Sequence, residues 1–363
     1  MNQEQNQQIE PIIEAPETST KNQPDPLQEI GAKNAYSAAG FALAATEGAK
    51  QLAVIAVVFL SSIAFYFMGI DTDSAVGSVY FGLGLTLIVI YFVGFPLMYA
   101  MMKNRPTQPP ERKKMPSGKI FLYFFMCLPL VFAGGMVSTI IDSFMDLIFG
   151  VGTGGNPASE IIEASQSLTQ VIFMLVLVVI LAPIFEELVF RKLLIDRLRQ
   201  YGKWPAIVMS SIAFGLFHGN VAQMVYAAFV GLILGVIYER YGNVWHVIIL
   251  HFLINFFAAV PITIFGVLEQ RGILTEETME YAEGALGLLM LSMAAVGLAF
   301  LIIELNKKEK LPQDRQLYIS PEGMLLKTEA PLGWRASLTA PGMVMYYIVA
   351  AIILVLNTLT MVL

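Results

Sequence analysis

The sequence has little charge and almost no cysteine or histidine. Of its 363 residues, 14% are charged, one is cysteine and three are histidine. The single cysteine, Cys127, lies in an apolar run, which excludes an intrachain disulfide framework and a cysteine-based metal site. No cleavable signal peptide is visible, because residues 1–35 are polar and rich in Gln, Glu, Asn and Pro. We expect this segment to be a disordered cytoplasmic tail.

Hydrophobic residues dominate the remainder of the chain. They make up 56% of the sequence, and the mean hydropathy is +0.66. A water-soluble protein of this length cannot bury so much apolar surface, so the composition indicates a polytopic membrane protein. The predicted fold class is an all-α bundle of about eight or nine transmembrane helices. Because the loops are too short for a soluble catalytic domain, we expect the functional site inside the bundle.

Nine apolar runs are long enough to cross about 30 Å of hydrocarbon. They lie at about 51–70, 78–102, 120–149, 167–196, 204–219, 221–239, 243–267, 282–304 and 342–363. A weakly amphipathic helix over 36–50 is predicted to precede the first run. The fifth and sixth runs are separated only by Gly219 and Asn220, which predicts a tight helical hairpin.

These runs predict four parts of the chain. The disordered tail is followed by a transmembrane core over 36–304 that holds the functional site. Residues 305–341 form a polar segment, which we expect to be a cytoplasmic linker. The last run, 342–363, is predicted to be a separate C-terminal transmembrane helix.

The positions of the basic residues predict the orientation of the chain in the membrane. The loop 103–119 contains six Lys or Arg residues, which places it in the cytoplasm by the positive-inside rule. Alternating from this loop puts the N-terminus inside and the C-terminus outside. Of the 22 Lys and Arg residues, only Arg271 then lies outside. We therefore predict a multi-pass protein of the cell membrane with a cytoplasmic N-terminus.

Three ionisable residues end the fourth apolar run. The stretch 182–191 contains Glu186, Glu187 and Arg191. A charged side chain at bilayer depth costs at least about 2.5–3.5 kcal/mol, so such residues are candidates for function. Glu187 and Arg191 are four residues apart on one helix face and can pair. Glu186 is rotated by about 100° from Glu187, which leaves it available to a partner on another helix.

Two of the three histidines also lie within apolar helices. His218 ends the fifth run, and His251 and Asn255 are four residues apart on one face of the seventh. At 1.5 Å per residue, Glu186, His218 and His251 lie at overlapping depths of about 12–20 Å from the predicted cytoplasmic helix ends. A common site is therefore geometrically permitted, with the two histidines as partners of Glu186. The third histidine, His246, is nearer the cytoplasmic surface and is predicted to be structural or interfacial.

This set of side chains suits hydrolysis. A carboxylate in an apolar bundle can act as a general base toward water. One histidine can hold that water or pass a proton to the leaving amine. A second histidine and an amide N–H can stabilise the oxyanion of a tetrahedral intermediate. Alternatively, Glu186, His218 and His251 are a possible ligand set for zinc that leaves one position open for water.

The three sequence pieces, taken in order on separate helices, resemble the CPBP family of intramembrane proteases. That family covers type II CAAX prenyl endopeptidases and bacterial bacteriocin-processing or immunity homologues, also called the Abi family. The motifs are E-E-x-x-x-R at Glu186, Glu187 and Arg191, F-x-x-x-H at Phe214 and His218, and H-x-x-x-N at His251 and Asn255. The resemblance spans about 171–258, and each motif position is matched.

The resemblance implies a helical bundle with a conical, cytoplasm-facing cavity that hydrolyses peptide bonds within the membrane. By this analogy Glu186 would activate water together with His218. His251 and Asn255 would stabilise the oxyanion, and the charged pair of the fourth helix would support the site. The predicted catalytic residues are thus Glu186, Glu187, Arg191, His218, His251 and Asn255. The implied partners are the lipid bilayer and a peptide or protein substrate, and we expect no nucleic acid.

The family is described both as metalloproteases and as metal-free, glutamate-dependent proteases. The H-E-x-x-H zinc motif of many metalloproteases is absent from this sequence. We therefore expect a glutamate-dependent mechanism without a cofactor, with zinc as the alternative. Serine and aspartyl intramembrane protease motifs, G-x-S-x with a partner histidine and G-x-G-D, are not found either.

Two other interpretations remain open from the sequence. A non-catalytic immunity or regulatory protein could keep the same bundle and bind a peptide or a partner protein. A transporter could use Glu186 and the histidines as a proton relay, although we find no inverted repeat in the sequence. The complete motif set favours the enzyme over both.

Overall fold

The computed structural model describes residues 26–69, 88–149, 168–306, 317–319, 325–327 and 332–360, and most of them are helical. Seven of the helices in this part of the chain are long and apolar enough to cross a membrane. Two shorter apolar helices, 91–102 and 203–217, accompany them. The predicted all-α polytopic bundle is confirmed. Residues 1–25 and the first part of the second predicted run lie outside the described residues.

The first helix, α1 (Pro26–Met68), joins segments that the sequence analysis separated. The predicted helix over 36–50 and the first apolar run form one continuous helix. Residues 26–35 were predicted to be disordered but form the first turns of α1, so that boundary is wrong. The physical reason is packing, because Ala32 and Tyr36 are fully buried in the core of the bundle.

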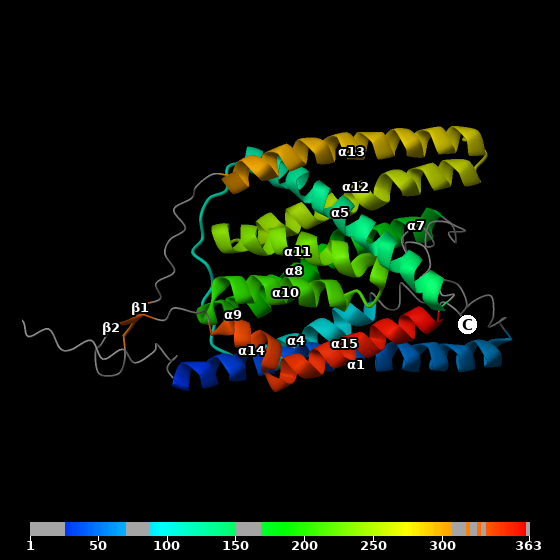
Figure 1. The fold of residues 1–363 in the computed structure, drawn as a ribbon. Coiled ribbons are helices and arrows are strands. Elements are labelled where there is room, and N and C mark those ends of the chain that lie inside the picture. The colour runs from blue at the N-terminus through cyan, green and yellow to red at the C-terminus, as the bar shows by residue number, and fades with distance from the viewer. Residues whose placement is uncertain are drawn as a thin grey trace, which may run out of the picture.

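One side of the bundle is formed by the two ends of the chain (Figure 1). Here α1 lies beside the C-terminal helix α15 (Pro341–Thr360) and the short α4 (Phe95–Met102), which follows the π-helical turn η1 (Ile90–Gly94). The short helix α14 (Gly333–Thr339) also contacts α1. Termini far apart in the sequence are thus packed together along the bundle.

The other side is formed by three long helices, α5 (Gly118–Phe149), α12 (Val244–Gln270) and α13 (Glu276–Asn306). Between the two sides, α10 (Lys203–Phe217) packs against α11 (Val221–Tyr241). Outside the bundle two short strands pair antiparallel, with Leu317 opposite Lys327 (Figure 1). They are β1 (Leu317–Ile319) and β2 (Leu325–Lys327).

The fourth apolar run is not a uniform α-helix. It contains, in order, α7 (Leu168–Leu175), the π-helix η2 (Val176–Leu181), α8 (Ala182–Glu187), the π-helix η3 (Leu188–Ile195), α9 (Asp196–Leu198) and the 3₁₀ turn η4 (Arg199–Tyr201). A π-helical turn displaces backbone groups from the regular ladder and frequently marks a functional site. The helix that carries both glutamates therefore has π-helical turns on each side.

The predicted hairpin between α10 and α11 is present. Gly219 adopts φ +68°, a left-handed conformation that glycine accepts without a steric penalty. Asn220 then caps α11, because its side-chain oxygen accepts the backbone N–H of Gln223 at 2.8 Å. Gly215 allows close contact, since a Cβ there would lie 2.3 Å from the carbonyl oxygen of Met224. The end of α10 is therefore held tightly against α11.

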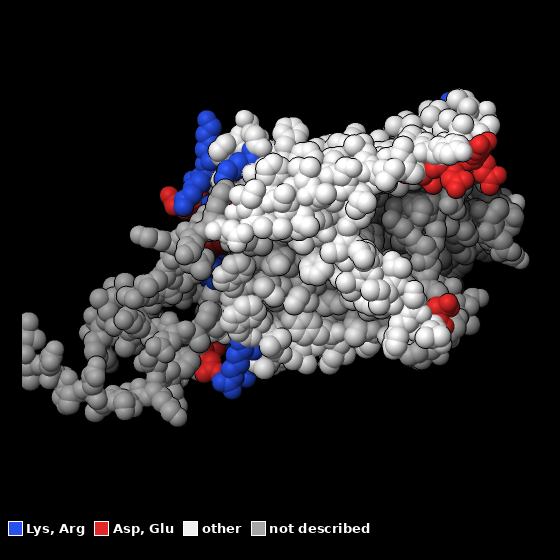
Figure 2. Space-filling model, turned by 45° about the horizontal axis from the view of Figure 1, so that its top comes forward, with Lys and Arg blue, Asp and Glu red and all other residues white. Residues whose placement is uncertain are grey.

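Charged side chains gather at the two ends of the bundle, and an uncharged belt lies between them (Figure 2). One end has basic residues in ion pairs, such as Arg199 with Glu239 and Arg240 with Glu304, each at 2.7 Å. The visible charges at the opposite end are mainly acidic (Figure 2). The belt fits a lipid bilayer.

Candidate functional site

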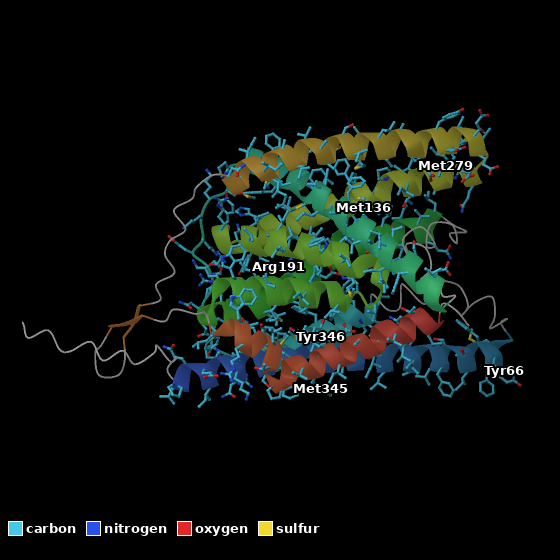
Figure 3. All side chains as sticks on the ribbon, viewed as in Figure 1. Tyr66, Met136, Arg191, Met279, Met345 and Tyr346 are labelled. Atoms are coloured by element: carbon cyan, nitrogen blue, oxygen red, sulfur yellow. The ribbon has the colours of Figure 1, made fainter. Side chains whose placement is uncertain are left out.

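Glu187 and Arg191 form an ion pair in the interior of the bundle, where Figure 3 labels Arg191. Arg191 Nε lies 2.9 Å from Glu187 Oε2, and both side chains are 0% exposed. The angle at this contact does not meet hydrogen-bond geometry, so the attraction is that of two charges. The structure thus pairs the two residues that the i,i+4 spacing predicted. Each charge is neutralised within its own helix.

Glu187 also contacts a second helix through its other oxygen. His251 Nδ1 lies 3.0 Å from Glu187 Oε1. A carboxylate oxygen only accepts, so Nδ1 carries the proton of this hydrogen bond. The other ring nitrogen, Nε2, lies 3.8 Å from Glu186 Oε2. The sequence analysis named His251 as a partner of Glu186, but its closer partner in the structure is Glu187.

Glu186 makes no hydrogen bond to any residue that the structure describes. Its side chain is 16% exposed, and His251 Nε2 lies 3.8 Å from its Oε2. The preceding residue, Phe185, is held between two aromatic rings of the adjacent segment. Its ring centroid lies 4.7 Å from that of Tyr91 and 5.3 Å from that of Phe95. Helix α8 is therefore anchored while the carboxylate of Glu186 remains available to water or substrate.

His218 lies at the C-terminal end of α10. Its Nδ1 is 2.9 Å from the backbone carbonyl oxygen of Phe214. Because a carbonyl oxygen accepts, Nδ1 carries a proton and the neutral ring keeps a lone pair on Nε2. This is the tautomer that can accept a hydrogen bond from water through Nε2.

The ring of Phe214 connects the parts of the site. Its centroid lies 5.0 Å from that of His218 and 5.6 Å from that of His251, nearly perpendicular to both rings. The guanidinium of Arg191 lies 5.3 Å from the same centroid, within the range of a cation–π contact. The phenylalanine of the F-x-x-x-H motif therefore contacts both histidines and the buried ion pair.

Asn255 supplies a donor that the π-helix η2 lacks. The backbone N–H of Ala182 bonds to the carbonyl oxygen of Leu177, five residues back. The next residue, Pro183, has no N–H, so the carbonyl of Val178 has no helical donor. Asn255 Nδ2 donates to that carbonyl oxygen at 2.9 Å. The amide thus satisfies a backbone group that apolar surroundings would otherwise leave unpaired, and it keeps a second N–H.

The structure brings Glu186, Glu187, Arg191 and His251 together directly, and it joins His218 to them through Phe214. His218 and Glu186 do not form an ion pair within 4.0 Å, although both are described. Within the described ranges no three His, Cys, Asp or Glu side chains are grouped so that they could hold a metal ion. Glu186, His218 and His251, the residues of the zinc alternative, are therefore not arranged as a metal site, and the proposed reaction does not use zinc.

A charged pair of α1, Glu47 and Lys50, lies beside this site and was not predicted from the sequence. Lys50 is only 5% exposed, and its Nζ lies 2.7 Å from the carboxylate of Glu47. Lys50 Nζ also lies 4.6 Å from the ring centroid of Phe217, the residue before His218. A signal existed in the E-x-x-K spacing next to a long apolar run, but the pair was assigned to an amphipathic helix. Nothing in its spacing indicated that this helix contacts α10.

The range that carries these contacts also matches a known protein family. Residues 168–257 match the family described as "Type II CAAX prenyl endopeptidase Rce1-like". All of the predicted site residues lie within this range. The predicted resemblance to the CPBP family is confirmed. The CPBP-type region therefore comprises the helices from α7 to the first half of α12, and both α1 and α15 lie outside it.

One curated relative is similar to part of this chain. It is "Putative membrane peptidase YdiL" of Bacillus subtilis (strain 168), 26% identical over 122 residues. The alignment covers 33% of this chain and 49% of that protein, so the chain spans about half the length of the relative it matches. No solved structure matches the chain.

Proposed function

We propose that this protein is an intramembrane endopeptidase that hydrolyses a peptide bond of a membrane-associated peptide or protein tail. The proposal is carried by the environment of Glu186, a carboxylate inside an apolar bundle that has no hydrogen-bond partner in the described structure. Its neighbour Glu187 is neutralised by Arg191, so only one of the two glutamates is available for chemistry. The match to the CPBP family and the peptidase relative support this reaction class.

In the proposed reaction Glu186 acts first as a general base. Its carboxylate takes a proton from water, and the water oxygen forms a bond to the carbonyl carbon of the substrate. The carbonyl electrons move to the oxygen, which gives a tetrahedral intermediate. Protonated Glu186 then donates the proton to the leaving nitrogen while the C–N bond breaks. One new carboxyl terminus and one new amino terminus result.

His218 orients the attacking water in this scheme. The hydrogen bond of Nδ1 to the carbonyl of Phe214 leaves Nε2 able to accept from that water. Fixing the water in one orientation removes the entropy cost of aligning it during the reaction. His218 therefore assists Glu186 without taking the proton itself.

His251 and Asn255 stabilise the oxyanion in this scheme. When His251 carries a second proton, its Nε2–H lies on the side of Glu186 while Nδ1 keeps its hydrogen bond to Glu187. Asn255 offers the N–H that is not bonded to Val178. Removing one such donor typically lowers kcat by about 10²–10³-fold.

We further propose that the protein lies in the cell membrane with its N-terminus in the cytoplasm. The proposed division is a transmembrane protease core to residue 304, a cytoplasmic linker over 305–341 and a C-terminal transmembrane helix. The gathering of Lys and Arg at one end of the bundle supports this orientation (Figure 2). The substrate would then be a peptide or protein segment that enters the bundle from the bilayer or the cytoplasm.

The test is cleavage of membrane-embedded peptides by the purified protein in liposomes, followed by mass spectrometry. Glu186→Gln keeps the volume of the side chain but removes the base, so we expect kcat to fall by about 10²–10⁴-fold. Glu283→Gln is the matched control, because Glu283 is exposed on α13. Equal cleavage by Glu186→Gln and the unaltered protein would contradict the proposal. Peptide binding without cleavage by the unaltered protein would indicate the non-catalytic alternative.

A further inference from the structure

The backbone carbonyl groups at the end of α10 have donors from several helices. A helix end leaves its last carbonyls without partners from its own backbone. At α10 the N–H groups of His218 and Gly219 bond to the carbonyls of Gly215 and Leu216, at 3.2 and 3.1 Å. Together with the bond of His218 Nδ1 to Phe214, these contacts close the last turn around His218.

Three further donors reach this helix end from outside the CPBP-type region. Tyr346 and Asn357 of α15 donate to the carbonyl oxygens of Ala213 and Gly219, at 2.8 and 2.9 Å. Lys50 of α1 donates to the carbonyl oxygen of Phe217 at 3.4 Å. Two of these carbonyls, those of Phe217 and Gly219, belong to the residues directly before and after His218, and the third lies one turn earlier in α10. We refer to Lys50, Tyr346 and Asn357 as the α10 clamp.

The two helices that carry the α10 clamp are locked to each other. Gly342 of α15 donates its backbone N–H to the hydroxyl of Ser37 on α1 at 3.1 Å. Gly40 faces the same crossing, where an added Cβ would lie 2.2 Å from the carbonyl carbon of Gly342. Backbones that approach this closely cannot slide without repacking. The donors of α1 and α15 therefore act on α10 as one unit.

The buried charge of Lys50 is better explained by a role in positioning the end of α10 than by a contribution to the stability of the fold. Its ammonium is balanced by Glu47 and lies over the ring of Phe217. A buried ion pair is often no more stabilising than apolar residues of the same volume. An ammonium does, however, donate a directed hydrogen bond to the carbonyl beside His218.

We infer that the α10 clamp makes α1 and α15 part of the active site, by fixing the last turn of α10 and with it the tautomer and direction of His218. Lys50 and Asn357 are positioning residues, because they act through backbone carbonyls and touch no reacting atom. If either donor is lost, the last turn loosens and Nδ1 of His218 no longer has a fixed acceptor. The predicted effect on catalysis rests on the proposed function, whereas the predicted effect on the tautomer of His218 holds whether or not the protein is a protease.

The test uses the small number of histidines. With ¹⁵N-labelled histidine the whole protein gives three pairs of imidazole nitrogen signals, one pair for each histidine, which His218→Gln and His246→Gln variants assign. We expect His218 to be protonated on Nδ1 in the unaltered protein. Two variants should shift His218 toward a mixture of the Nδ1–H and Nε2–H tautomers and leave the signals of His251 unchanged. They are Asn357→Leu and the double variant Glu47→Gln/Lys50→Met, which avoids leaving Glu47 unpaired.

The matched controls are Thr46→Val on α1 and Thr358→Val on α15. Among the residues that the structure describes, the hydroxyls of these two threonines bond to carbonyls of their own helices, those of Ala42 and Leu354. Both controls should keep the His218 signal of the unaltered protein. An unchanged His218 signal in Asn357→Leu and in the double variant would overturn the inference, whatever the activity.

A second readout separates positioning from general destabilisation. In the liposome assay the two clamp variants should lower kcat by about 10–100-fold with little change in KM, because a small displacement of a positioned group costs rate. A Lys50→Arg variant keeps the positive charge and the hydrogen-bond donors, so it should retain most of the kcat of the unaltered protein. If the unaltered protein cleaves no peptide, the proposed function fails, but the histidine spectra still decide the inference about the α10 clamp.

Discussion

The two adjacent glutamates of α8 have different surroundings at the scale of single residues. Glu187 is fully buried between Arg191 and His251, whereas Glu186 is partly exposed and lies 3.8 Å from His251 Nε2. The pairing of Glu187 with Arg191 was predictable, because i,i+4 geometry is local to one helix. The bond from His251 to Glu187 was not, because it depends on how α12 packs against α8.

This difference predicts unequal effects on stability. Glu187→Ala leaves Arg191 as an unpaired buried charge, so we expect the free energy of unfolding to fall by about 3–5 kcal/mol. Glu186→Gln should change it by less than about 1 kcal/mol, because Glu186 has no hydrogen bond to lose. Unfolding by SDS in mixed micelles measures both values. Equal destabilisation by the two substitutions would contradict the division between a structural and a chemical glutamate.

At the scale of elements, the site depends on interruptions in the fourth helix. The apolar pattern of residues 167–196 predicted one membrane helix but did not predict η2 and η3. Pro183 was the visible clue, because it removes one N–H from the ladder. The clue did not say which residue would bond to the freed carbonyl of Val178. That partner, Asn255, comes from another helix and follows from tertiary packing alone.

The role of Asn255 as a backbone donor predicts a compensating pair of substitutions. Asn255→Leu leaves the carbonyl of Val178 unpaired, so the free energy of unfolding should fall by about 1–3 kcal/mol. Adding Pro183→Ala restores a backbone N–H near that carbonyl and should recover most of this stability. Peptide cleavage should stay low in the double variant, because the proposed oxyanion donor is still missing.

Both quantities can be followed in the same preparations, by SDS unfolding and by the liposome assay. Pro183→Ala alone serves as the control for changes in the helix itself. No recovery of stability in the double variant would contradict the role of Asn255 in satisfying Val178. Full recovery of cleavage would contradict its role at the oxyanion.

At the scale of the whole molecule, composition predicted the helical bundle because so much apolar surface requires a bilayer. The α10–α11 hairpin was also predictable, since Gly219 and Asn220 are the only residues between two long runs. The continuity of α1 and its contact with α15 were not predictable. The contact between α1 and α15 joins segments about 300 residues apart in sequence, and such contacts leave no local pattern. Lys50 was missed as a site neighbour for the same reason.

The distribution of charge predicts the orientation of the molecule. We expect the loop 103–119 to face the cytoplasm and residues near 275 to face outside. In a Cys127→Ala background, Thr275→Cys should react with a membrane-impermeant maleimide in intact cells. Ser117→Cys should react only after the membrane is permeabilised. Both positions are exposed in the structure, so the opposite labelling pattern would mean an inverted topology.

The central claim is that water activated by Glu186 attacks the peptide bond directly. A single turnover in H₂¹⁸O, with the protein in excess over a membrane-embedded peptide, tests this step. Direct attack predicts that the new carboxyl terminus of the product contains ¹⁸O after this first turnover and that Glu186→Gln forms no product. If Glu186 instead formed an anhydride with the peptide carbonyl, releasing the amine, and water then attacked the carboxyl carbon of Glu186, the first product would carry an unlabelled oxygen from the protein. That result would contradict the account.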